Sequence, residues 1–361
     1  MILLFAPVCI LLCSGWGNVQ KVTDTITLRD EKLNFTPHGF YIADVADERS
    51  DHNSVALLND NKGSRHSPVT VDLKGGAARA VNFFIYRNLR RDTATHPVMI
   101  GIKEFKLTES NLPAGRVSGR LGVVFSFALQ LSYRTVHLVD YRGGIRYNRP
   151  DNQPIDVEAI LRHGIEDALS YFNAWTVSQA DHNPLLATGV KVRFADYSEK
   201  PEGDTIYYAI NRPLTWADFK EKPRESRFEA EVFTSIGYNE RIEVIKGVIY
   251  VNMDIKVDMA KSDCWVKAAG RDDYTLNHEQ RHFDIEKLVS EHFKKKILAL
   301  DLPVDNFDGP INMEYLETLR EATAMQKQYD DQTRHGQDRH AQERWNEKID
   351  KELKAYGVKR N

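Results

Sequence analysis

The chain contains little cysteine. Only three cysteines occur among its 361 residues, and two of them, Cys9 and Cys13, lie within the first 17 residues. The third, Cys264, has no histidine near it in the sequence with which to form a nucleophilic pair. An internal disulfide is therefore excluded for an exported chain that has lost those residues, and Cys264 is expected to be a small packed side chain.

The chain also has no strong excess of charge of one sign. Its 49 basic side chains stand against 52 acidic ones, a net charge of -3. This balance gives no indication of a nucleic-acid partner. Apolar residues make up 42% and charged residues 28% of the sequence, as in an ordinary soluble globular protein.

Long apolar runs are missing except at the very start, in residues 1–17, whose sequence is MILLFAPVCILLCSGWG. This run is too short to span a bilayer and fits the apolar region of a signal peptide, although basic residues do not precede it. We therefore expect export to the periplasm, the cell envelope or the medium. Cys13 offers a site for lipidation and so a membrane tether, although Leu12 before it is larger than the residue usual at such sites.

The length predicts two domains, and no repeat or low-complexity tract is present. The turn-rich segment 178–189 is the candidate boundary between an accessory domain over 20–178 and a second domain over 190–361. In the first domain, composition and periodicity predict strands over 39–47, 96–107 and 120–133, two short strands within 134–147, and helices over 78–91 and 156–175.

The second domain changes character along its length. Strands are predicted over 190–197, 205–212, 229–238 and 241–258, and helices over 275–300, 311–334 and 337–356. The predicted fold class is α+β, with a mixed α/β domain followed by a domain of strands and then helices.

The first of these three helices carries the sequence HEQRH, in which His278 and His282 are four residues apart. Residues i and i+4 share one helix face, so both imidazoles can converge on one ion at zinc–nitrogen distances of about 2.0–2.1 Å. Glu279 follows the first histidine and is suited to act as general base toward a water at the ion. The spacing therefore predicts one zinc ion held by His278 and His282.

A short motif of this kind also arises by chance on surface helices. Two observations favour a metal site: the apolar stripe of the same helix lies next to the histidine face, and strand-like sequence precedes the helix. A third is the supply of candidate ligands further along the chain.

A catalytic zinc needs a third protein ligand and one open position. Glu286 is excluded as that ligand because it lies eight residues, or about 12 Å of helix, from His278. Glu286, Asp284 and Asp331 are predicted to orient the ligands through hydrogen bonds. The third ligand must come from a later helix, and the candidates there are His335, His340, Asp330, Asp331 and Glu321.

Five ordered segments of the chain resemble a bacterial family of unknown function described as secreted zinc-dependent proteases. The matching elements are PLTWADFKEKP (213–223), FEAEVFTSIGY (228–238), DCWVK (263–267), HEQRHFDI (278–285) and YDDQTRHG (329–336), with QERW (342–345) after them. Cys264 stands where the family pattern has serine. The resemblance covers about residues 205–350 and implies a zincin-type fold.

The same resemblance implies His335 as the third ligand, because His335 falls in the histidine–glycine element of the family. It also suggests Tyr329 as a hydrogen-bond donor to the oxyanion, with a packed aromatic as the equal alternative. Trp216 and Trp345 are expected to be structural. Residues 20–178 resemble, loosely, small α/β domains of envelope lipoproteins.

These observations predict an exported zinc metallopeptidase acting on a protein or peptide substrate, with Glu279 as general base. Two alternatives remain open at this point. One is a cell-envelope protein whose metal is only structural, with Asp331 or His340 closing the fourth position. The other is a zinc amidase acting on cell-wall peptides.

Overall fold

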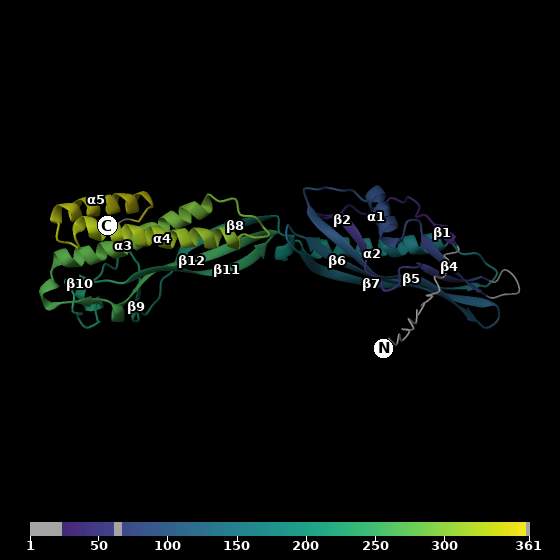
Figure 1. Ribbon diagram of the computed structural model, residues 1–361, viewed down its shortest axis with the longest axis horizontal. Coiled ribbons are helices and arrows are strands. Elements are labelled where there is room, and N and C mark those ends of the chain that lie inside the picture. Colours follow the sequence, from purple (N-terminus) through teal and green to yellow (C-terminus); the bar gives the residue numbers. More distant parts are fainter. Residues whose placement is uncertain (1–23, 61–66, 359–361) are drawn as a thin grey trace, which may run out of the picture. The chain divides into compact units, whose positions relative to one another are not determined.

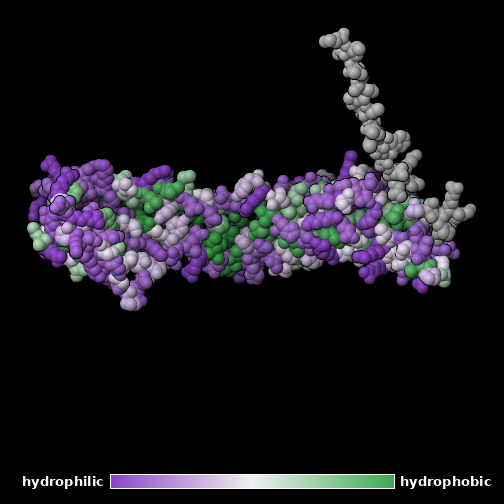
Figure 2. Space-filling view, turned by 60° about the horizontal axis from the view of Figure 1, so that its bottom comes forward, coloured by the Kyte–Doolittle hydropathy of each residue, from purple (hydrophilic) through white to green (hydrophobic). Residues whose placement is uncertain are grey.

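The structure, a computed structural model, describes residues 24–60 and 67–358. The predicted signal peptide over 1–17 and the lipidation site Cys13 lie outside these residues. The described chain falls into two compact units that divide between Ser178 and Gln179, at the start of the turn-rich segment 178–189. Within the described residues no helix is both long and apolar enough to cross a membrane. Hydrophilic residues cover most of the face shown in Figure 2, with smaller hydrophobic patches among them.

The first unit is a mixed seven-stranded sheet with two helices (Figure 1). The strands are β1 (Asp24–Ile26), β2 (Phe40–Asp47), β3 (Ala56–Asp60), β4 (Ser67–Leu73), β5 (His96–Leu112), β6 (Arg116–Gln130) and β7 (Thr135–Pro150). They run in the order β1-β4-β3-β5-β6-β7, and β2 pairs with the first half of β5. The helices are α1 (Ala77–Asn88) and α2 (Val157–Gln179).

Aromatic packing joins α2 to this sheet. Phe172 of α2 stacks on Phe127 of β6 with ring centroids 4.2 Å apart, and its edge meets Phe40 of β2 at 4.7 Å. All three side chains are almost completely buried. The 3.6-residue periodicity of α2 is therefore the pattern of a helix with one face against a sheet.

The second unit contains a four-stranded sheet and a small two-stranded one. The large sheet has β8 (Gly189–Asp196), β9 (Thr205–Tyr207), β11 (Thr234–Ile245) and β12 (Val248–Ala260), and the small one pairs β10 (Ala230–Glu231) with β13 (Trp265–Val266). Every second residue of β12 is buried, from Ile249 to Met259. This alternation gives the sheet one apolar face for helices to cover.

Three helices complete the second unit: α3 (Asp273–Leu298), α4 (Asp308–Thr333) and α5 (Arg339–Ala355). Helix α3 packs on the sheet, and α4 and α5 both pack on α3 (Figure 1). Phe283, Val289 and Phe293 of α3 join the core under the sheet. The α+β class predicted from the sequence is confirmed.

Four strand predictions were wrong in detail. The strand predicted over 229–238 is divided between β10 and β11, which belong to different sheets. Residues 135–150 form the single strand β7, not two short strands, because Gly143 and Gly144 pair in register with β6. The predicted strand 241–258 is broken at Lys246 and Gly247, whose φ values of 51° and 70° make the hairpin turn between β11 and β12. The strand predicted over 205–212 extends only to Tyr207.

Candidate metal centre

The first turns of α3 present the two histidines of the HEQRH motif. Asp272 caps the helix by accepting a hydrogen bond of 2.7 Å from the backbone nitrogen of Thr275. This cap fixes where the helix begins, about one and a half turns before His278. His278 is buried and the side chain of His282 is 13% exposed, so both rings point toward the interior of the unit.

A carboxylate from α4 meets the two rings. Asp330 Oδ1 lies 3.3 Å from Nε2 of His278 and 3.1 Å from Nε2 of His282, and the two Nε2 atoms are 3.3 Å apart. Among the residues that the structure describes, one cluster of three or more histidine, cysteine or acidic side chains is compact enough to hold a metal ion. It consists of His278, His282 and Asp330.

The dimensions of this triangle fit a tetrahedral zinc ion. Zinc–nitrogen bonds of about 2.0–2.1 Å at tetrahedral angles place neighbouring ligand atoms about 3.3 Å apart. The three observed separations lie between 3.1 and 3.3 Å. In addition, Asp330 Oδ1 is buried and receives no hydrogen bond of regular geometry. A buried acceptor of this kind is costly without a partner, so the residues present suit a cation.

Each imidazole is held from behind by a glutamine. Nδ1 of His278 lies 3.1 Å from Oε1 of Gln342 on α5, and Nδ1 of His282 contacts Oε1 of Gln326 on α4. The amide nitrogen of Gln342 donates to the carbonyl oxygen of Tyr274 at 3.3 Å, and that of Gln326 donates to the carbonyl oxygen of His282 at 2.9 Å.

These contacts determine the tautomers. Because both amide nitrogens donate elsewhere, both Oε1 atoms are acceptors, and each histidine must carry a proton on Nδ1. When both rings are neutral, their Nε2 atoms therefore present lone pairs toward Asp330 Oδ1. The three converging atoms are then all acceptors, which is the arrangement that a metal ion requires.

Proton and metal compete for this position. Burial lowers the pKa of His282, but the adjacent Asp330 carboxylate outweighs burial and raises that pKa to about 9. The two histidines in turn hold the pKa of Asp330 well below its usual range, in spite of its own burial. Without a cation, His282 and Asp330 are therefore an ion pair, and binding a metal must release the proton.

Glu279 lies beside the two histidines in a buried position of its own. Only 4% of the residue is exposed, and Oε2 accepts a hydrogen bond of 2.9 Å from the backbone nitrogen of Val232, just after β10. Burial raises the pKa of Glu279. A fixed carboxylate with a raised pKa has the properties of a general base near neutral pH.

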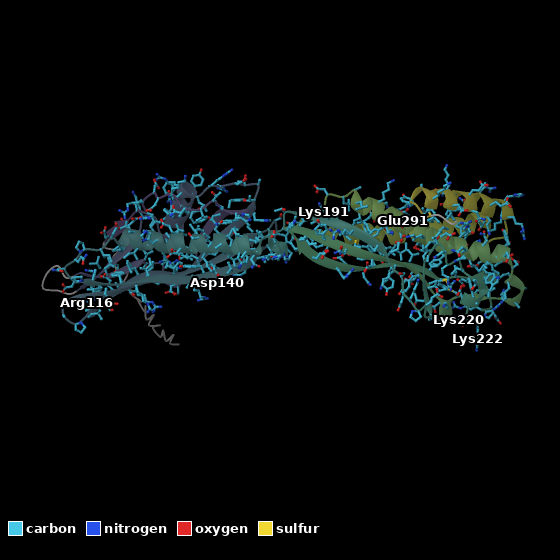
Figure 3. The ribbon with its side chains drawn as sticks, turned by 180° about the vertical axis from the view of Figure 1, so that it is seen from behind. Arg116, Asp140, Lys191, Lys220, Lys222 and Glu291 are labelled. Carbon is cyan, nitrogen blue, oxygen red and sulfur yellow. The ribbon has the colours of Figure 1, made fainter. Side chains whose placement is uncertain are left out.

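A cavity of about 520 Å³ opens onto Glu279 and the ligand triangle. Its wall is the continuous segment 227–234 on one side and parts of α3, α4 and the α4–α5 loop on the other. The sites of Lys220 and Lys222, in the loop before this segment, are marked in Figure 3. A volume of this size admits several residues of a peptide or a small polar ligand.

The structure places His335 beside the triangle and not within it. The residue follows the left-handed cap of α4 at Arg334 and has a φ of 52° itself. Its ring packs on Phe228 with centroids 4.1 Å apart, and Nδ1 lies 3.4 Å from Asp330 Oδ1. The ligand set expected from the sequence, with His335 as third member, thus differs from the cluster observed, in which Asp330 takes that place.

Tyr329 does not line the cavity. Its side chain is completely buried, its ring stacks on that of His278 at 4.8 Å, and its hydroxyl lies 3.5 Å from the carbonyl oxygen of His278. This environment corresponds to the packed aromatic that was the alternative to an oxyanion donor. Trp345 packs against the same ring.

The residues predicted to orient the ligands lie in different places. Glu286 accepts a hydrogen bond of 3.1 Å from Gln326, which contacts His282. Asp284 accepts from Tyr208 at 3.0 Å and from Arg281 at 3.0 Å, so it joins α3 to the strand side of the unit. Asp331 is exposed and pairs with Lys327, on the face of α4 turned away from the histidines.

Two contributors were missed by the sequence interpretation. Gln326 was given no role, although it lies four residues before Asp330 and therefore on the same helix face. Gln342 lies on α5, in the segment QERW, and no local signal in the sequence marks it as a partner of His278. For Gln326 the i, i+4 spacing is such a signal, because the face of α4 that carries the ligand must be turned toward α3.

Comparisons with known proteins supply little. No family model and no curated protein matches the chain. Among solved structures, a DUF330 family protein of Xanthomonas campestris covers 43% of this chain and 95% of its own, at 11% identity and a TM-score of 0.27. A second, an uncharacterised protein, covers 40% and 97%, at 5% identity and a TM-score of 0.22. Likenesses this weak carry no argument about the chain.

Proposed function

We propose that the chain is an exported zinc-dependent metallopeptidase whose ion is held by His278, His282 and Asp330. The observation that carries the proposal is the convergence of two imidazole Nε2 atoms and one carboxylate oxygen at 3.1–3.3 Å from one another, beside Glu279 and facing a cavity. The resemblance of residues 205–350 to secreted zinc-dependent proteases, and with it a zincin-like second unit, forms part of this proposal. Export rests on the apolar residues 1–17.

In this proposal the chain supplies three ligands and leaves one position toward the cavity. A zinc ion bound there would polarise a carbonyl group and lower the pKa of a water to about 7. Glu279, held by the backbone of Val232, would accept the proton of the attacking water and return it to the leaving amine. Segment 227–234 would hold the peptide along the cavity wall.

The test is the variant Glu279→Gln in the full chain. Purified protein should contain about one zinc per chain, and the variant should keep that zinc while hydrolysis of a fluorogenic peptide library falls to background. Glu343→Gln, at an exposed position of α5, is the matched control and should retain full activity. Unchanged hydrolysis in Glu279→Gln would overturn the assigned mechanism.

A structural metal site is the second candidate, and one observation favours it. His335 lies close to the position left open, with Nδ1 3.4 Å from Asp330 Oδ1. If His335 closed that position, zinc would raise the melting temperature but no peptide or amide substrate, including cell-wall peptides, would be hydrolysed. An X-ray absorption spectrum that shows three histidine ligands would support the structural site. A spectrum that shows two histidine ligands would support the metallopeptidase.

A further inference from the structure

The outer face of α1, in the first unit, carries only basic and aromatic side chains. Its exposed residues are Arg79, Phe83, Tyr86, Arg87 and, just past the last turn, Arg90. Their spacing of three and four residues places them in one stripe along the helix. The opposite side of α1, including Val81, Phe84 and Ile85, is buried, so this stripe is the face turned to solvent.

The aromatic side chains of the stripe are unusually exposed to solvent. Phe83 is 57% and Tyr86 is 67% exposed, although both lie in the middle of a helix. No acidic residue occurs anywhere in α1. The stripe is therefore a mixed surface of apolar rings between guanidinium groups, and no carboxylate of the helix neutralises them.

Most of these cations lack an acidic partner. Arg87 pairs with Asp30 and its guanidinium lies 5.3 Å from the Phe83 ring. Arg91 is exposed beside Arg90, just past the end of α1, and lies over the ring of Tyr41 at 5.1 Å. Within the described part of the chain, no ion pair involves Arg79, Arg90 or Arg91. Guanidinium groups without partners on a solvated face are available to an external anion.

The hollow beside α1 is too small for a soluble anion. This hollow, lined in part by Tyr86, Arg90 and Arg91, has a volume of only about 20 Å³. Such a space holds about one water molecule. Recognition must therefore be spread over the stripe, as it is when an amphipathic helix lies on a membrane, with basic groups at the phosphates and aromatic rings at the interface.

We propose that the outer face of α1 docks on a membrane surface rich in anionic phospholipid. Arg79, Arg90 and Arg91 pair with lipid phosphates, and Phe83 and Tyr86 enter the interfacial region. The predicted leader, residues 1–17, joins this same unit at Asp24, so a lipid on Cys13 would hold this unit near a bilayer. The proposal is independent of the metal site.

The test compares vesicles of neutral phosphatidylcholine with vesicles containing about one third phosphatidylglycerol. The full chain carries Cys13→Ser, so lipidation is absent, and any apolar contribution of residues 1–17 is common to both vesicle types. Co-sedimentation should be at least about a hundredfold stronger on the anionic vesicles, the product of three basic contacts at roughly fivefold each, and should weaken as salt is added. Equal binding to both vesicles would overturn the proposal.

Substitutions localise the effect. The triple variant Arg79→Gln, Arg90→Gln and Arg91→Gln should reduce binding to anionic vesicles about a hundredfold, since each basic residue near the surface contributes roughly a fivefold factor. The matched control replaces Arg116, Arg120 and Arg146 of β6 and β7 by glutamine, which changes the net charge equally. Figure 3 marks Arg116. An equal loss in the control would contradict a role for α1.

The aromatic residues provide a separate readout. Phe83→Ser with Tyr86→Ser should weaken binding to anionic vesicles several-fold and remove the part that persists at high salt, because apolar insertion is not screened. Circular dichroism checks that each variant remains folded. Binding to a fluorescent heparin fragment but not to vesicles would overturn the membrane proposal in favour of a soluble polyanion.

Discussion

Oε1 of Gln342 lies 3.1 Å from Nδ1 of His278, although 64 positions separate the two residues along the chain. Gln326 makes the corresponding contact with His282. Both glutamines come from helices other than α3, which carries the histidines. The orientation of the two rings therefore depends on the packing of α4 and α5 and not only on the HEQRH motif.

Replacing Gln342 by methionine should weaken zinc binding. The substitution keeps the size of the side chain but removes the acceptor that fixes the proton on Nδ1 of His278, and loss of such a partner costs about 10–100-fold in metal affinity. Competition with a chromogenic chelator measures the change. Gln328→Met, on the exposed side of α4, should leave the affinity unchanged; a loss there as large as in Gln342→Met would contradict the assignment.

The third ligand can be tested by comparing Asp330 with His335. Asp330→Asn removes the charged ligand atom and should weaken zinc binding by more than the roughly 100-fold expected for loss of an orienting partner. His335→Gln should change the affinity far less. Asp331→Asn, next along α4 but exposed, is the control for the loss of one negative charge. If His335→Gln weakened zinc binding more than Asp330→Asn did, His335 would be the third ligand.

Zinc binding should release a proton at neutral pH. The pKa of His282 is about 9 because of Asp330, so below pH 9 the free site holds a proton that zinc must displace. The apparent affinity should therefore rise about tenfold per pH unit and level off above pH 9. Calorimetry at pH 7 in buffers of different ionisation enthalpy measures the number of protons released per zinc ion bound. A value of zero would refute the ion pair.

Gly336 tests how closely the α4–α5 loop must approach His278. Its φ is +75°, and a Cβ added there would lie 3.3 Å from Cγ of His278. Gly336→Ala should destabilise the chain by roughly 1–2 kcal/mol for the left-handed backbone and also weaken zinc binding by displacing the ring.

Gly357→Ala is the control for the glycine substitution. That residue has a φ of +80° but no atom within 4 Å of the added Cβ. The variant Gly357→Ala should lose about as much thermal stability as Gly336→Ala, but it should bind zinc as tightly as the unchanged protein. If both variants bound zinc normally, the contact between Gly336 and His278 would have no bearing on the site.

The helices of the second unit could be predicted from the sequence because each has a local signal. Asp272 precedes α3 as a cap, and the periodic apolar residues of α3 continue to Ile297. The juxtaposition of the two histidines then follows from their spacing alone, because residues four apart lie on one face of any helix. The turn at Lys246 and Gly247 was missed because alternating residues continue through it.

The complete site could not be predicted, for a physical reason. Which residue of α4 reaches the histidines depends on the rotation of α4 against α3, and this rotation is set by tertiary packing, including the contact of Tyr329 with His278. The sequence offers Asp330 and Asp331 at adjacent positions of α4 and His335 just past its end, among other candidates. Only packing distinguishes the buried Oδ1 of Asp330 from the exposed carboxylate of Asp331.

The glutamines behind the imidazoles also determine the charge of the centre. An amide accepts the Nδ1 proton of each histidine without adding a negative charge, whereas aspartate or glutamate in the same place would add one at each ring. With Asp330 as the single anionic ligand, a divalent ion would keep one net positive charge. Glu279, buried beside it, would balance that charge when ionised, so the centre would be neutral before a substrate enters. It would stay neutral when Glu279 takes the proton of the water, because the hydroxide left at the ion would carry the negative charge.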